Sequence, residues 1–207
     1  ECYNIMEFSK LNQNRHKVTK FDGRKVTVDE VKAILSEAVL APSAHNIQPW
    51  HFVIVDSQEM RLALSTAMHG KNAVQNEAAG ATLVVFSDKD LPERVRDMVE
   101  IGTDFLPVDH KADLLMKLPG MFEKFTSEQL AEYLALNIGL VSQNFVLAAN
   151  NKGLKTNMIL GFDKAKAKEV LAIEDRFWPE LIITMGYSDE QGTASYRLPV
   201  EDITDVL

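Results

Sequence analysis

The chain has 207 residues, of which 46% are hydrophobic and 25% charged, and its formal net charge is −8 at pH 7. These values are typical of a soluble globular protein with one core of ordinary size, and they argue against a nucleic-acid-binding surface. No apolar run approaches the roughly 20 residues of a membrane span, and no secretory leader pattern opens the chain.

We expect residues 1–13 to form a leading segment and residues 14–207 to form one domain. Met6 is the expected native start, which would leave residues 1–5 outside the natural protein. The single cysteine is Cys2. It excludes an internal disulfide, makes a cysteine nucleophile improbable, and fits a reducing, cytoplasmic setting.

The first informative stretch is a basic cluster in an acidic chain, Asn-Arg-His-Lys-Val-Thr-Lys-Phe at residues 14–21. Arg15 could grip a phosphate with two parallel hydrogen bonds, and His16 and Lys17 would add positive charge. The alternative is a solvated helix end. The residues alone leave both interpretations open.

A helix is predicted to follow Thr27, which forms a capping-box pattern with Glu30. Apolar residues then recur at helical spacing, which predicts one face packed on the core. They are Val31, Ile34, Leu35, Ala38 and Val39.

Residues 41–52 form an unusually rich connection between that helix and an apolar strand at 52–55. Each of its two prolines restricts the residue before it, so Ala41 and Gln48 are expected to be extended. The result would be a stiff polar loop suited to holding a ligand, and the alternative is a plain helix-to-strand turn with a packed Trp50. Its hydrogen-bonding side chains are Ser43, His45, Asn46 and Gln48.

Further strands are predicted at 81–86 and 179–185, and further helices at 58–68, 127–150 and 163–172. The 127–150 helix is apolar nearly all round, which indicates burial on all sides and therefore a second subunit over one face. Residues 91–125 contain helix-like stretches with Met116, Phe122 and Phe125. For these we favour a core role over a lid.

The loop sequence A-P-S-A-H-N-I-Q-P-W-H-F resembles the A-P-S-x-x-N-x-Q-P-W-x-F motif of the FMN-dependent nitroreductases, flavoproteins that take hydride from NADH or NADPH. The resemblance runs from about Asn14 to Pro199 and is weakest between about Lys89 and Phe125. It implies an α+β fold, a three-layer α-β-α sandwich with a central, mostly antiparallel sheet, in an intertwined homodimer. The last residues, 200–207, would extend across the partner subunit.

The basic cluster is similar to the family's opening motif, R-[RH]-S-x-[RK]-x-[FY], whose side chains meet the ribityl phosphate and the pyrimidine edge of the flavin. Arg15, His16 and Phe21 match this motif. Lys17 stands where a serine is usual, and Thr19 where a basic residue is usual. Negative charge builds near that position when the flavin is reduced, so the flavin potential is expected to be lower unless Lys17 or Lys20 compensates.

Two later segments carry further implied roles. Asn76 matches an amide that hydrogen-bonds the pyrimidine edge, and Ala79 lies where a lysine would shortly follow. Residues 156–163 match the segment that crosses flavin N5, with Leu160 where several relatives have Glu; the alternative is a turn before a helix. Residues 195–199 resemble a K-x-R-x-P tail, in which Arg197 would meet the phosphate and Ser195 replaces the lysine.

The resemblance thus implies a flavin site at a subunit interface, with Pro42, Ser43, Ala44 and Asn46 contributed by the second chain. The other implied cofactor-binding residues are Arg15, His16, Lys17, Thr19, Asn76, Met158, Ile159, Leu160, Gly161, Ser195 and Arg197.

The implied function is an NAD(P)H-dependent FMN oxidoreductase with ping-pong kinetics. Hydride passes from the nicotinamide to flavin N5 and then to a nitroaromatic or quinone. No side chain need act as a catalytic acid or base, since the cofactor carries the chemistry. The choice between NADH and NADPH is open.

Two alternatives stay open. The missing basic residues favour a flavin-binding protein without efficient turnover. The same scaffold could also reduce an enone, a halogenated aromatic or free flavin. The sequence has no G-x-G-x-x-G or Walker motif and no metal-ligand spacing among its histidines, so neither a separate dinucleotide domain nor a metal site is expected.

Overall fold

The structure is a computed structural model that describes residues 7–102 and 106–207. The expectations for residues 1–6, including the start at Met6 and the single Cys2, lie outside the described residues.

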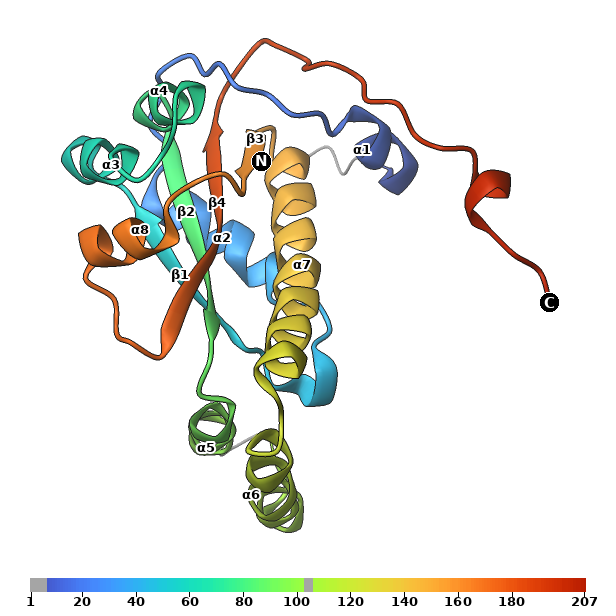
Figure 1. The fold of residues 1–207 in the computed structure, drawn as a ribbon. Coiled ribbons are helices and arrows are strands. Elements are labelled where there is room, and N and C mark those ends of the chain that lie inside the picture. Colours follow the sequence, from blue (N-terminus) through green and yellow to red (C-terminus); the bar gives the residue numbers. More distant parts are fainter. Residues whose placement is uncertain (1–6, 103–105) are drawn as a thin grey trace.

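The centre of the fold is a four-stranded sheet in the order β1-β2-β4-β3, with every neighbouring pair antiparallel (Figure 1). The strands are β1 (Trp50–Val55), β2 (Ala81–Asp88), β3 (Lys155–Ile159) and β4 (Phe177–Gly186). The predicted antiparallel α+β architecture is confirmed. Among these strands only β3 was missed, because its five residues include the polar Thr156 and Asn157, which break the apolar pattern of a strand.

Helices cover both faces of the sheet, so the predicted three-layer sandwich is confirmed. On β2, Leu83 and Val85 face one apolar core, while Val84 and Phe86 face the other, as the two-residue period of a strand requires. The first core is covered by α2 (Val28–Ala38) and α7 (Ser127–Asn151). On the second face lie α3 (Gln58–Ser65), α4 (Lys71–Glu77) and α8 (Lys164–Leu171).

The predicted capping box at the start of α2 is present. Glu30 N donates to Thr27 Oγ1 at 3.2 Å, and Thr27 N donates back to Glu30 Oε2 at 2.8 Å. Two backbone donors that helix geometry leaves without a partner are thereby satisfied, which fixes where this helix begins.

Helix α7 packs on the sheet along one side only. An 18-residue window of α7 has a mean hydropathy of 1.2, which would suit a membrane span, but a core helix meets the same criterion, and α7 contacts both α2 and β2. On the side away from the sheet, the side chain of Leu136 is 64% exposed and that of Leu140 is 38% exposed. The all-round burial predicted from the sequence is therefore absent in the single chain.

Between β2 and α7 the chain makes an excursion beyond one end of the sheet (Figure 1). It consists of α5 (Leu91–Ile101) and α6 (Val108–Phe122), which pack on each other. The rings of Phe122, Phe125 and Tyr133 meet edge to face within 5.7 Å, so the predicted core role of both phenylalanines is confirmed. Met116 is 74% exposed, so the core role predicted for it is wrong.

The first and last described segments of the chain run over the surface. Helix α1 (Phe8–Asn14) leads into the 15–21 segment. After β4, all residues from 189 to 207 are exposed, and this tail projects away from the body of the fold; near its end it forms a short 3₁₀ turn, η2 (Val200–Ile203) (Figure 1).

Candidate functional site

A groove forms where the 17–21 segment runs beside the sheet. Lys17 makes a parallel bridge to Thr156 of β3, and Val18 N donates to Thr156 O at 3.2 Å. The ring of Phe21 lies so close to Gly186 that a Cβ there would come within 2.8 Å of it. Only glycine permits this approach.

The groove has a volume of about 1200 Å³. Three parts of the chain line it: residues 17–21, helix α4 with the glycine before it, and the tail at 193–195. Lys17, Lys20 and Lys71 are exposed lining residues, and Lys20 pairs with Glu190 at 3.4 Å.

A cationic end continues the groove, since Ser195 lines both the groove and a shallow pocket with Arg15, His16 and Arg197. The tail reaches this place by crossing tightly over the N-terminal segment. At Gly192, with a φ of +73°, a Cβ would lie 2.6 Å from Lys17 O. The structure therefore gathers six predicted site residues, namely Arg15, His16, Lys17, Thr19, Ser195 and Arg197.

The prediction for Asn76 is wrong. Its side chain is fully buried, and its Nδ2 donates to Arg61 O at 2.8 Å and to Ser65 Oγ at 3.0 Å. Its Oδ1 accepts a hydrogen bond from Thr82 Oγ1 at 2.7 Å. The amide joins α3, α4 and β2 and has no access to the groove.

Two neighbouring amides, Asn72 and Gln75, line the groove instead. Asn72 Nδ2 donates to Gly161 O at 3.4 Å, which ties α4 to the predicted 158–161 segment. In the sequence, residues 69–72 have the pattern of a turn, and no apolar period marks a helix at 71–77. Sequence reasoning therefore could not show that positions 72 and 75 share a face while 76 turns inward.

Gln75 is a buried member of the groove lining. Its side chain is 6% exposed, and its Oε1 accepts a hydrogen bond from Asn157 Nδ2 at 3.0 Å. Its buried Nε2 has no hydrogen-bond partner within the described chain. Ala79, for which a basic residue was expected, is buried among apolar residues and is not part of the groove.

Along the 158–161 segment, exposed side chains alternate with a buried one. Met158 is 43% and Leu160 74% exposed, whereas Ile159 packs in the second core at 3% exposure. Of the predicted contacts here, Ile159 can offer a ligand only its backbone.

The loop at 42–46 is held by contacts within its own chain. Gln48 N donates to Ser43 Oγ at 2.9 Å, and Ala44 N donates to Asn137 Oδ1 of α7 at 2.9 Å. Tyr133 OH donates to Ala44 O at 2.7 Å. Burial raises the pKa of Tyr133 to about 12, which keeps this hydroxyl a donor.

The backbone of this loop is strained. His45, Asn46 and Gln48 have φ values of +57°, +53° and +51°, a region that non-glycine residues rarely adopt. The extended conformation predicted for Gln48 from the following proline is therefore wrong. Such strain persists only where surrounding contacts impose it, and it concentrates at functional sites.

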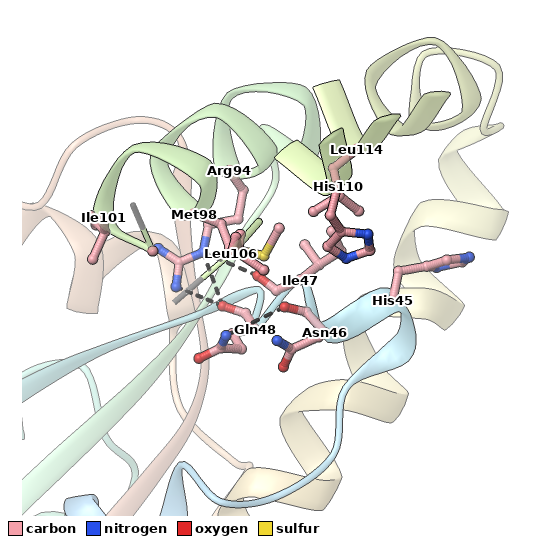
Figure 2. Close-up of a pocket in the computed structure, with 11 residues that line it drawn as sticks. His45, Asn46, Ile47, Gln48, Arg94, Met98, Ile101, Leu106, His110 and Leu114 are labelled. Atoms are coloured by element: carbon pink, nitrogen blue, oxygen red, sulfur yellow. Dashed lines mark hydrogen bonds between the residues drawn. The ribbon is translucent and has the colours of Figure 1, made fainter. Parts of the chain in front are cut away.

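Asn46 lines a second cavity of about 390 Å³, between this loop and the α5–α6 excursion (Figure 2). Its wall combines apolar side chains with polar ones, and the polar lining residues are His45, Asn46, Gln48, Arg94 and His110. Burial lowers the pKa of the Arg94 guanidinium below its usual value. The apolar lining residues are Ile47, Met98, Ile101, Leu106 and Leu114.

Apart from the buried Asn76, the predicted site residues fall into two groups within one chain. One group surrounds the groove beside β3 and α4, and the loop group, of which Asn46 lines the second cavity, lies on the α7 side near α5 and α6. In the part of the chain that the structure describes, no His, Cys, Asp and Glu side chains cluster in a way that could hold a metal.

Comparison with known proteins identifies the scaffold. The model of the nitroreductase family matches residues 13–187. A Streptococcus pyogenes protein named as a candidate NAD(P)H nitroreductase is 42% identical over 200 residues, covering 97% of this chain and 99% of that protein. A Lactiplantibacillus plantarum protein named CLA biosynthesis enone reductase is 28% identical over 199 residues, covering 94% of this chain and 91% of its own.

Among solved structures, an Exiguobacterium sibiricum protein described as a candidate nitroreductase in complex with FMN superposes with a TM-score of 0.91. It is 29% identical, and the match covers 98% of each chain. With a family match over most of its length and a relative at 42% identity, this chain belongs to the nitroreductase family.

Proposed function

We propose that this protein is an FMN-dependent NAD(P)H oxidoreductase of the cytoplasm that reduces nitroaromatic or quinone acceptors with ping-pong kinetics. When bound, FMN would take hydride from NADH or NADPH and pass it to the second substrate. The groove beside β3 and α4 would hold this cofactor. What supports the proposal is the composition of the groove, which combines a cationic end with the buried amide nitrogen of Gln75, for which the described chain supplies no hydrogen-bond partner.

The residues present fit a phosphorylated aromatic ring. Arg15, His16 and Arg197 line the cationic end, where guanidinium groups can bind a phosphate through paired hydrogen bonds. Asn72 and the unpartnered Nε2 of Gln75 supply polar groups of the kind that hydrogen-bond carbonyl and ring nitrogen atoms. Gly161, beside Asn72, allows a ring to approach the backbone.

A complete site would need two copies of the chain. Pro42, Ser43, Ala44 and Asn46 were expected to meet the flavin, yet in one chain Asn46 lines a different cavity from the groove residues. The exposed side of α7, with Leu136 and Leu140, and the apolar tail offer the surfaces for a homodimer. In that dimer the loop of one copy would close the groove of the other.

The test is the colour of the purified protein. We expect a flavin absorption band, or uptake of added FMN at one per chain, and loss of that band when NADPH or NADH is added without oxygen. Nitroaromatic and quinone acceptors should then restore the band. Colourless protein that takes up no FMN would overturn the proposal, and bound FMN that nicotinamide cannot reduce would favour a flavin-binding protein instead.

A second acceptor class is favoured by the second cavity. Its five apolar side chains, beside the Arg94 guanidinium and the imidazoles of His45 and His110, suit an apolar molecule that carries a polar group. The relative named as an enone reductase provides a precedent for such a substrate on this scaffold. Faster reoxidation of the reduced protein by an apolar enone than by a nitroaromatic would identify this activity.

A further inference from the structure

The buried Nε2 of Gln75 is the observation that carries a further step. Its side chain is 6% exposed, its oxygen is held by Asn157, and its nitrogen has no hydrogen-bond partner in the described chain. A buried donor without a partner destabilises a fold. Because Gln75 also lines the groove, its missing partner is best supplied by a ligand bound there.

In the structure, the bond to Asn157 leaves the nitrogen end of the Gln75 amide available. Asn157 Nδ2 is a donor, so it fixes the Gln75 oxygen on its own side and leaves the NH₂ group for the ligand. An NH₂ group can only donate. The ligand must therefore offer an acceptor atom, such as a ring carbonyl oxygen or an unprotonated ring nitrogen.

The donor is also uncharged. The lysines that line the groove, Lys17, Lys20 and Lys71, are exposed, and Lys20 is paired with Glu190. Water screens their charges from the buried floor. Close to Gln75, the described groove residues therefore offer hydrogen bonds without a buried positive charge.

We propose that Gln75 is a tuning residue for the ring that binds in this groove, an inference that rests on the proposed function. The neutral amide binds an acceptor atom of the flavin and compensates the negative charge of the reduced ring less than a cation would. A hydrogen bond from a charged donor is about twice as strong as one from a neutral donor. The protein should therefore hold FMN at a lower reduction potential than the same groove with a lysine at position 75.

The experiment is a redox titration of FMN-loaded protein with Gln75→Lys and Gln75→Glu variants. Gln75→Lys supplies a charged donor, whereas Gln75→Glu is nearly isosteric and replaces the donor with a negative acceptor. Ser36→Lys on α2 adds the same charge as the first variant at an exposed position outside the groove and serves as the control.

We expect Gln75→Lys to favour reduced over oxidised FMN about tenfold more than the wild type, which raises the two-electron midpoint by about 30 mV. Gln75→Glu should lower the midpoint and weaken FMN binding, and Ser36→Lys should leave both unchanged. If Gln75→Lys does not fold, the Gln75→Glu midpoint decides the question. Wild-type protein that binds FMN, with midpoints unchanged in the folded Gln75 variants, overturns this inference alone. Wild-type protein that takes up no FMN overturns the proposed function as well.

Discussion

The guanidinium of Arg94 on α5 donates two hydrogen bonds to the carbonyl oxygen of Gln48, at 3.0 Å from Nε and 2.7 Å from Nη2 (Figure 2). Nε also lies 3.3 Å from Ile47 O. This clamp reaches the loop from 46 residues away along the chain. It holds Gln48, whose φ of +51° is unfavourable for a residue with a side chain.

Removing the clamp should release the loop. Hydrogen bonds from a charged group contribute about 1.5–3 kcal/mol, so Arg94→Ala should lower the free energy of unfolding by about 2 kcal/mol. Arg94→Lys keeps the positive charge but loses the planar guanidinium that donates two hydrogen bonds, so it should retain only part of the stability lost in Arg94→Ala. Urea unfolding measures the stability of both variants.

The matched control is Arg96→Ala, which removes an exposed ion pair with Glu93 and should change stability by less than about 0.5 kcal/mol. Equal losses at positions 94 and 96 would rule the clamp out.

Tyr133 should give the protein a sensitivity to alkaline pH. The folded state raises the pKa of this phenol to about 12, whereas in the unfolded chain it is about 10. Its contribution to stability is therefore complete below about pH 10 and is lost as the pH rises from 10 towards 12. Urea unfolding between about pH 9 and pH 11 should show a smaller decline for Tyr133→Phe than for the wild type. Identical slopes would contradict the assignment.

Replacing Asn76 should lower stability, whereas replacing Asn72 should lower FMN affinity, although the two residues lie one helical turn apart. Asn76→Ala removes the buried hydrogen bonds to Arg61 O, Ser65 Oγ and Thr82 Oγ1 and should lower the free energy of unfolding by about 1–3 kcal/mol.

Asn72→Ala should leave stability nearly unchanged and weaken FMN binding by about threefold to tenfold, which corresponds to one hydrogen bond. Calorimetric titration with FMN and thermal unfolding distinguish the two effects. A loss of FMN affinity in a stable Asn76→Ala protein would restore the flavin-binding role that the family motif implies for Asn76.

Arg197 should discriminate FMN from riboflavin, which lacks the phosphate. A charged hydrogen bond of about 1.5–3 kcal/mol corresponds to at least about tenfold in affinity, so Arg197→Ala should bind FMN at least about tenfold more weakly. Its affinity for riboflavin should stay the same. Arg96→Ala again provides the control. An equal loss for both ligands would place Arg197 away from the phosphate.

The tail from Val200 onward should matter for assembly rather than for the fold of one chain. Val200, Ile203, Val206 and Leu207 are each at least 64% exposed, so deleting 200–207 removes little buried surface. If these residues cover a second copy, their loss should weaken dimerisation by about tenfold or more, through the lost apolar burial. Sedimentation velocity over a range of concentrations measures this. The deletion keeps Arg197, and an unchanged dimer would exclude the role.

Much of this architecture could be predicted from local patterns. The apolar period of β1, β2, β4 and α7 indicated the layers, and Thr27 with Glu30 marked the start of α2. The site was harder, because a motif fixes positions along the chain but not which way a side chain points. Asn76 and Gln75 are adjacent in the sequence, and only the helix phase of α4 decides that one is a packing residue and the other lines the groove. Neither the strain at Gln48 nor the clamp from Arg94 has any local sign, since tertiary contacts impose both.

The position of β4 between β2 and β3 has a consequence for biosynthesis. Residues 177–186 form the last strand to leave the ribosome, yet they pair with both neighbours in the middle of the sheet. Until they emerge, the apolar residues of β2 lack one strand partner, and the nascent chain must wait with that surface uncovered. Pairings between strands so far apart in sequence form slowly, so this intermediate exposes apolar surface that favours aggregation.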